Sequence, residues 1–213
     1  ITAFTADHGE CFGERGIYWN HAGVYPATTH VPLVLAWPGA PVALVDVPVS
    51  QSDVGHTLLT LAGLGAEEFE GRDLRWALER EPATSPRFAL GYHARAASLD
   101  DGRWVLVLHL LETKSDDGVH TWRPGQVELF DRRADPRSER DLVADELERA
   151  REMRRRLLQW LASGDPEGYK GEYHFTAAID RALAVLGYSG GAEVGGTWYD
   201  ASRGDAFLER FGG

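Results

Sequence analysis

The sequence predicts an α/β unit followed by a small antiparallel sheet that packs with a long helix. Three observations predict this order. Two apolar runs, residues 1–5 and 30–37, are separated by a loop and followed by a helical pattern. Strand-like runs between residues 88 and 130 are separated by polar turns. Residues 145–162 then carry apolar side chains at helical spacing, which is typical of an amphipathic helix.

In the first unit, residues 1–5 are expected to form a buried strand that ends at Asp7, as at the ligand-binding edge of a parallel α/β sheet. Residues 30–37 are expected to form a second buried strand, ended by a Pro-Gly pair. A helix over residues 54–62 has Asp53 as its simplest N-cap and Gly63 as its end. Because a strand is already under way at Ile1, we expect an incomplete chain, which leaves a signal peptide and the compartment open.

The second unit should contain strands at residues 88–92, 103–108 and 126–130. The helix over 145–162 should bury its leucines and Met153. The arginines of residues 151–156 should lie on its solvent-exposed face, where glutamates alternate with them in the sequence. A short helix is expected at 176–186. The expected domains are the α/β part (1–85), a small α+β subdomain (86–164) and a tail (165–213).

Composition narrows the possible partners. The formal net charge of −11 over 213 residues makes nucleic acid an unsuitable partner, because phosphate binding needs clustered basic residues. The same negative net charge is compatible with bound cations. A single cysteine, Cys11, excludes an internal disulfide and a cysteine-based zinc site. No apolar run is long enough to cross a membrane.

Adjacent Asp7 and His8 at a strand end offer a carboxylate and an imidazole to one divalent cation. Taken alone, such a pair is more often a capped turn than a metal site. Gly9 permits a close backbone approach or a positive φ at this turn, and Glu10 adds a second carboxylate within reach.

Four blocks then resemble the sulfatase family in order and spacing. They are TADHGE (5–10), HAGVY (21–25), HVPLVLAWPG (30–39) and SDVGHTLLTLAGL (52–64). Later segments agree with the resemblance, including ELFD at 128–131 and AVLGY at 184–188. The resemblance implies the C-terminal part of an alkaline-phosphatase-like α/β sandwich, followed by the small antiparallel sheet and helix. It also implies a hydrolase acting on sulfuric esters.

The resemblance implies site residues at matching positions. Asp7 and His8 correspond to ligands of a divalent metal, usually Ca²⁺ in the family, although the softer nitrogen of His8 also suits Mn²⁺ or Zn²⁺. His21 stands where many relatives place a lysine that touches the sulfate ester, and a protonated imidazole could contact or protonate an ester oxygen. His30 corresponds to an arginine in relatives and is expected to anchor structure.

The family nucleophile, a cysteine converted to formylglycine, is expected upstream of this chain. Cys11 lacks its sequence context and is rejected as a nucleophile. The remaining histidines show no ligand spacing and are interpreted as packed or exposed residues. The isolated chain is therefore expected to be inactive.

Three functions stay open. The first is a metal-dependent sulfatase acting on sulfate monoesters of a small molecule or glycan. The second is a phosphonate monoesterase or phosphodiesterase with the same metal centre. The third is a metal-free structural or interaction module. Metal titration followed by thermal melting would separate the third from the others, because a ligand that binds only the folded state stabilises it.

Overall fold

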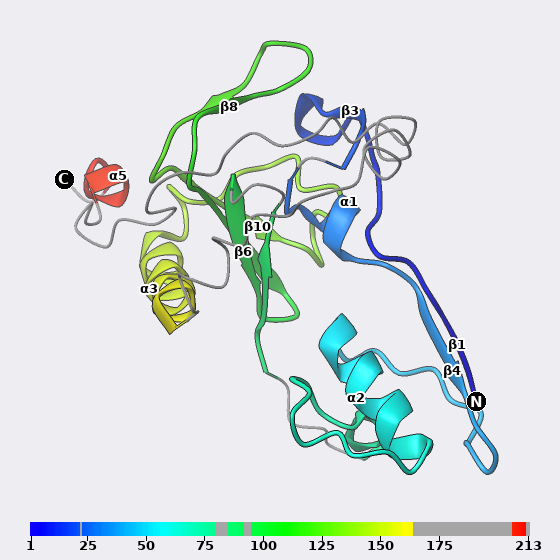
Figure 1. The fold of residues 1–213 in the computed structure, drawn as a ribbon. Helices are drawn as coiled ribbons and strands as arrows, with labels where there is room; N and C mark the ends of the chain where they lie inside the picture. The colour runs from blue at the N-terminus through cyan, green and yellow to red at the C-terminus, as the bar shows by residue number, and fades with distance from the viewer. Residues whose placement is uncertain (22, 80–84, 92–94, 164–205, 212–213) are drawn as a thin grey trace, which may run out of the picture.

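The computed structural model describes residues 1–21, 23–79, 85–91, 95–163 and 206–211. Its main body is a four-stranded sheet with α3 on one face and the segment that carries β2 and β3 on the other, whereas β1 and β4 run away from this body as a separate pair (Figure 1). The strands are β1 (Thr2–Thr5), β2 (Cys11–Phe12), β3 (Tyr18–Asn20), β4 (Leu33–Ala36), β5 (Arg87–Leu90), β6 (Ala96–Asp100), β7 (Trp104–His109), β8 (Thr113–Lys114), β9 (Thr121–Trp122) and β10 (Val127–Asp131). The helices are η1 (Glu14–Gly16), α1 (Pro26–Thr29), α2 (Gln51–Leu61), η2 (Leu74–Leu78), α3 (Leu147–Ser163) and α5 (Ala206–Glu209).

The central sheet has the order β10-β7-β6-β5 with antiparallel pairing throughout. Strand side chains alternate between the two faces, so one strand can serve two cores. On β7, Leu106 and Leu108 belong to the core under α3, whereas Val105 and Val107 belong to the core on the opposite face. The sheet therefore separates two hydrophobic cores, one on each of its faces.

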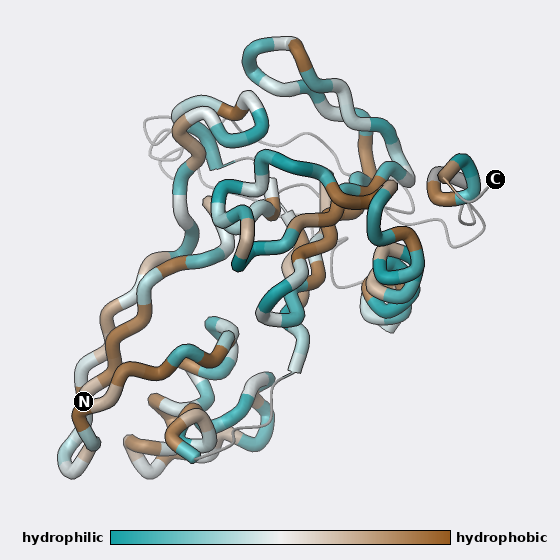
Figure 2. Tube along the Cα trace, turned by 180° about the vertical axis from the view of Figure 1, so that it is seen from behind, coloured by the Kyte–Doolittle hydropathy of each residue, from teal (hydrophilic) through white to brown (hydrophobic). Residues whose placement is uncertain are grey.

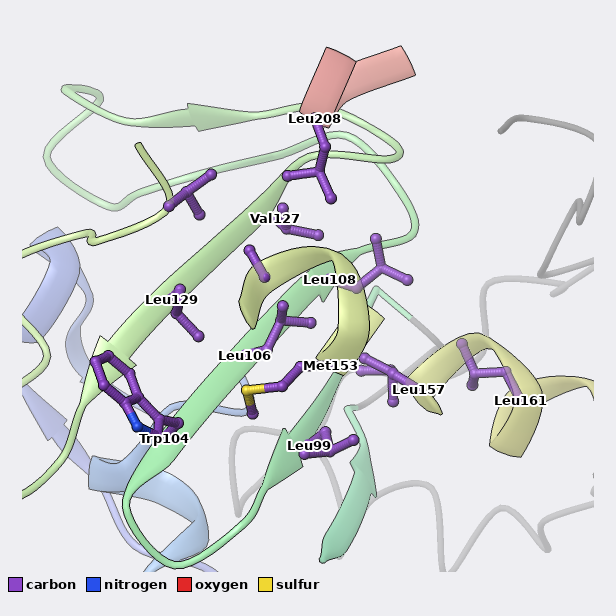
Figure 3. Packing of buried hydrophobic residues seen from close by; sticks show 13 residues of the cluster. Leu99, Trp104, Leu106, Leu108, Val127, Leu129, Met153, Leu157, Leu161 and Leu208 are labelled. Atoms are coloured by element: carbon purple, nitrogen blue, oxygen red, sulfur yellow. The ribbon is translucent and has the colours of Figure 1, made fainter. Parts of the chain in front are cut away.

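Helix α3 covers the first face. Its residues Ala150, Met153, Leu157 and Leu161 are buried at three- and four-residue spacing and meet Leu99, Leu106 and Leu129 of the sheet (Figure 3). Leu208 of α5 is also fully buried in this core. Removing these side chains from water is the main source of stability here, at roughly 1.5–3 kcal/mol for each large aliphatic side chain.

The predictions for this second unit are largely confirmed. Three of its strands and the long helix form at the expected positions, shifted by a few residues. The central strand β6 was missed, because Ala96, Ala97 and Ser98 have little of the β-branched or aromatic character that marks strands. The prediction that Arg154 lies on the solvent-exposed face of the helix was wrong, because this residue is only 6% exposed. The helix expected at 176–186 lies outside the described residues, and the domain boundaries remain predictions.

The strand pair β1–β4 differs from expectation. The two strands form where expected, but they pair antiparallel with each other and, in the described part of the chain, with no third strand. All four residues of β1 are exposed, including Phe4 at 63%, and apolar residues line both strands (Figure 2). The prediction of buried strands was wrong because burial needs a covering layer, and the described residues place none over this pair.

Helix α2 begins earlier than predicted. Ser50 is its N-cap, and Asp53 at the third helical position completes a capping box by accepting from Ser50 N at 2.9 Å. The interpretation of Asp53 as the N-cap is therefore corrected. Its other oxygen accepts from Arg72 N at 2.8 Å, which ties the helix to the following loop. Gly63 has φ +72° after the last turn, as predicted for a helix end. Within the residues described, no helix is both long and apolar enough to span a bilayer.

Candidate functional site

The loop after β1 brings two of the predicted site residues together. The imidazole rings of His8 and His21 stack with centroids 4.1 Å apart and an angle of 26° between the rings. His21 Nδ1 lies 3.6 Å from Glu10 Oε2, and His8 Nε2 lies 3.7 Å from Asp7 Oδ2. Two carboxylates and two imidazoles therefore share one small region of the surface.

The hydrogen bonds of His8 fix which ring nitrogen can bind a cation. His8 Nδ1 lies 2.8 Å from the carbonyl oxygen of Gly9, and a carbonyl only accepts, so Nδ1 carries the proton. The lone pair of a neutral His8 then sits on Nε2, on the side of Asp7. Metal-binding histidines commonly donate their second nitrogen to a carbonyl in this way.

The backbone around Asp7 is held from two directions. The Gln51 side chain, in the first turn of α2, donates to the carbonyl oxygens of Ala6 at 2.7 Å and Asp7 at 2.9 Å. Gly9 N donates to Thr28 O at 2.9 Å, and a Cβ on Gly9 would lie 2.1 Å from the carbonyl oxygen of Ala27. The close backbone approach expected for Gly9 is therefore confirmed, and no larger residue fits there without a shift of α1.

Asp7 and His8 suit a divalent cation as two of its ligands. A cation bound by both would need 2.0–2.6 Å to each ligand atom, which the 3.7 Å separation of Asp7 Oδ2 and His8 Nε2 allows. The Asp7 side chain is 85% exposed and is therefore accessible to a cation from solvent. Among the described residues, no group of three or more His, Cys, Asp or Glu side chains could hold a metal. This part of the chain thus offers a partial coordination shell.

The region also contains an unsatisfied acid. Glu10 Oε1 is buried without a hydrogen-bond partner, while Glu10 Oε2 faces His21. An orphaned buried carboxylate oxygen is costly unless a cation or donor reaches it. The expected role of Glu10 as a supporting carboxylate fits this arrangement.

The segment that carries His21 is fixed to the central sheet by a buried charge network that the sequence reasoning missed. Glu128 on β10 is 1% exposed and lies on the face that meets this segment. It accepts from Tyr25 Oη at 2.6 Å and pairs with His109 Nε2 at 2.9 Å and with Arg15. The available signal was one glutamate between two apolar residues, Val127 and Leu129, of the strand.

The protonation state of Glu128 follows from its partners. Burial alone would raise its pKa, but hydrogen bonding from His109 and the positive charge of Arg15, with Tyr25 as a further donor, lower the pKa to about 2. The ionised carboxylate holds three groups from β7 and from the segment containing η1 and α1. Arg15 has φ +56°, an uncommon conformation for a non-glycine residue, while its side chain reaches Glu128.

Cys11 is unsuited to nucleophilic chemistry, as the sequence predicted. It is fully buried, and burial first and then the charges of Glu14, Glu10 and Asp116 raise its pKa to about 12. His30 is exposed and its backbone N–H closes α1 by donating to Pro26 O at 2.9 Å, while the anchoring role of its side chain stays a prediction. His56, His109 and His120 contact carbonyl, carboxylate and aromatic groups, whereas His93 and His174 lie outside the described residues.

Comparison with known proteins identifies the class. Residues 1–64 match the family model Sulfatase. The choline-sulfatase of Rhizobium meliloti is 30% identical over 144 residues, which cover 64% of this chain and 25% of that protein. The chain is therefore similar to sulfatases, in agreement with the resemblance of the four sequence blocks.

Solved structures agree on the fold. The structure of BT4656 in complex with its substrate D-glucosamine-2-N,6-O-disulfate matches with a TM-score of 0.56 at 21% identity, over 74% of this chain and 33% of that one. The phosphonate monoester hydrolase of Agrobacterium radiobacter matches with a TM-score of 0.54 at 24% identity, over 75% and 34%. The chain spans about a quarter of the length of the choline-sulfatase and about a third of these structures.

Proposed function

We propose that this chain supplies part of the active site of a metal-dependent sulfatase that hydrolyses sulfate monoesters. Asp7 and His8 would bind the divalent cation, most simply Ca²⁺, and His21 would contact the ester. A formylglycine nucleophile would come from outside residues 1–213. The observation that carries the proposal is the stacking of His21 on His8 at 4.1 Å, because it joins the ligand pair to a proton-carrying group.

When bound, the cation would act as a Lewis acid that offsets negative charge on the sulfuryl oxygens. The chain's own residues would orient the reactants. His8 presents Nε2 because Gly9 O holds its Nδ1 proton. His21, whose Nδ1 lies 3.6 Å from Glu10 Oε2, would donate a proton to an ester oxygen as the leaving group departs.

Metal binding can be tested without turnover. The melting temperature of the full-length protein is measured with CaCl₂ or MnCl₂ against NaCl of equal ionic strength. A cation held by Asp7 raises the melting temperature by mass action, and Asp7→Ala removes that rise. Asp46→Ala, which changes an exposed acid elsewhere, serves as the matched control and keeps the rise. An equal calcium response in both variants would rule out Asp7 as a ligand.

Turnover is then measured with 4-nitrophenyl sulfate. Asp7→Ala is expected to abolish hydrolysis and metal content together, whereas His21→Ala should lower the rate and spare the metal. Loss of metal in His21→Ala would mean that His21 is a ligand and not the proton donor. Unchanged turnover in Asp7→Ala would refute the proposed function.

A second function is favoured by one observation, the fold match with a phosphonate monoester hydrolase. The same residues could act on a phosphonate monoester or a phosphodiester, because a divalent cation can offset negative charge on oxygens bound to phosphorus as well as on oxygens bound to sulfur. Comparing kcat/KM for a 4-nitrophenyl sulfate and a 4-nitrophenyl phosphonate monoester decides between them. A larger value for the phosphonate would replace the sulfatase proposal with this one.

A further inference from the structure

The β2–β3 hairpin exposes three aromatic rings beside the candidate site. Trp19 is 80% exposed, Phe12 61% and Tyr18 48%, and we name these three residues the aromatic patch. The rings of Phe12 and Trp19 meet edge to face, with centroids 5.1 Å apart. Single exposed apolar residues are ordinary, but adjoining rings that are mostly open to solvent are typical of a ligand surface.

The patch adjoins the residues proposed to act on the ester. Cys11 pairs with Asn20 at the open end of the hairpin, so Glu10 and His21 continue directly from the two paired strands. These two side chains approach to 3.6 Å. A ligand on the patch would therefore lie beside the ester-contacting end of the site.

The hairpin is held in place from outside. Tyr18 N donates to Asp116 Oδ2 at 2.8 Å, and Asp116 N donates to Gly16 O at 3.0 Å, both across to the β8–β9 loop. Trp19 lies where the strand register shifts, with φ +51°. A bulge of this kind redirects a side chain, and here the redirected indole is the most exposed ring of the patch.

Carboxylates surround the base of the patch. Phe12 N donates to Glu14 Oε2 at 2.7 Å, Asp116 binds Tyr18 N, and Glu10 precedes β2. Arg137, 3.7 Å from Glu14 Oε1, offsets part of this charge. The remaining negative charge is felt at Cys11, next to Phe12, where burial first and then Glu14, Glu10 and Asp116 raise the thiol pKa.

We propose that the aromatic patch binds an organic cation, an alkylated or quaternary ammonium group, in the alcohol part of the ester substrate. Aromatic faces attract such cations, and nearby carboxylates add Coulomb attraction. A bare metal ion would not use the rings, and a polysulfated glycan would meet a chain of net charge −11 with the same sign. Its role as a substrate subsite rests on the proposed function, whereas cation binding itself does not.

Binding is tested on the full-length protein with tetramethylammonium chloride as the probe. Tert-butanol, a neutral molecule of similar shape, is the matched ligand. Relaxation of the methyl proton signals of each ligand gives its affinity for every variant. Tetramethylammonium should bind at least about tenfold more tightly than tert-butanol, because only the cation is attracted to the rings.

Two variants locate the site. Trp19→Ala should weaken tetramethylammonium binding about tenfold, and Trp19→Phe should retain most of it. Phe4→Ala, an exposed aromatic residue on β1, is the control and should leave the affinity unchanged. Equal affinity for the two ligands, or an affinity that Trp19→Ala does not change, would overturn the proposal. Self-association that Trp19→Ala abolishes, without cation binding, would overturn it in favour of a protein contact.

The outcome can be separated from that of the proposed function. Hydrolysis of 4-nitrophenyl sulfate without tetramethylammonium binding would reject the organic-cation site and leave the sulfatase proposal intact. Tetramethylammonium binding without turnover of any sulfate ester would reject the sulfatase proposal and leave a cation-binding site. If both hold, a sulfate ester that carries a trimethylammonium group should have a lower KM than its neutral analogue, and Trp19→Ala should remove the difference.

Discussion

The hydroxyl of Tyr25 donates a hydrogen bond of 2.6 Å to Glu128, across 103 positions of sequence. Tyr25 lies at the start of α1, four residues after His21, and Glu128 lies in the middle of the buried strand β10. With Arg15 and His109 bound to the same carboxylate, this contact fixes the site-bearing segment to the central sheet.

Replacing Glu128 with Ala should destabilise the fold strongly. Arg15 would lose its buried partner, and Tyr25 and His109 would lose their acceptor, so we expect a loss of about 3–5 kcal/mol in the free energy of unfolding. Urea denaturation measures it. Glu148→Ala, which breaks an exposed pair on α3, is the control and should cost less than about 0.5 kcal/mol. Equal effects of the two substitutions would contradict a structural role for the network.

The same carboxylate should make stability depend on acid pH. Its pKa is lowered from an ordinary 4.5 to about 2 in the folded protein, so its contribution is complete above pH 4.5 and is lost as pH falls toward 2. That contribution is on the order of 3 kcal/mol. Glu128→Gln cannot titrate, so its deficit relative to the original protein should shrink between pH 5 and pH 2.5 in urea titrations. A deficit that stays constant over this range would show that Glu128 is not the titrating group.

The fold was predictable where one short segment determined its own structure. Leucines at helical spacing predicted α3, and strand-like runs between polar turns predicted β7 and β10. Prediction failed where a second segment decides the outcome. The burial of β1 depends on what covers it, and β6 is defined by its pairing with β5 and β7 and not by its own residues.

In the candidate site, too, prediction succeeded for residues within local motifs and failed for contacts between distant segments. Asp7, His8 and His21 were found from the order of four motifs, and the structure brings both histidines together. The network around Glu128 could not be found in this way, because Arg15 and Tyr25 lie more than a hundred residues from their partner. The aromatic patch was missed because exposure of Trp19 depends on a register shift between two very short strands.

Cys11 should resist thiol reagents in the folded state. Its pKa of about 12 leaves very little thiolate at neutral pH, and the sulfur is fully buried. Because it is the single cysteine of residues 1–213, Ellman's reagent should leave Cys11 almost unmodified in native buffer and should titrate it in guanidinium chloride. Rapid labelling of the native protein would contradict the burial and would reopen a chemical role for this residue.

Gly9 should tolerate no side chain. A Cβ there would lie 2.1 Å from Ala27 O, so Gly9→Ala must move either α1 or the loop that carries His8, at a cost of about 1–3 kcal/mol. Because the carbonyl of Gly9 holds the Nδ1 proton of His8, the same shift should reduce the calcium-dependent rise in melting temperature. Gly65→Ala is the matched control, since its Cβ would meet only the movable end of Glu67. If Gly9→Ala keeps both its stability and its calcium response, neither the close approach at Ala27 nor the Gly9 carbonyl positions the proposed ligand.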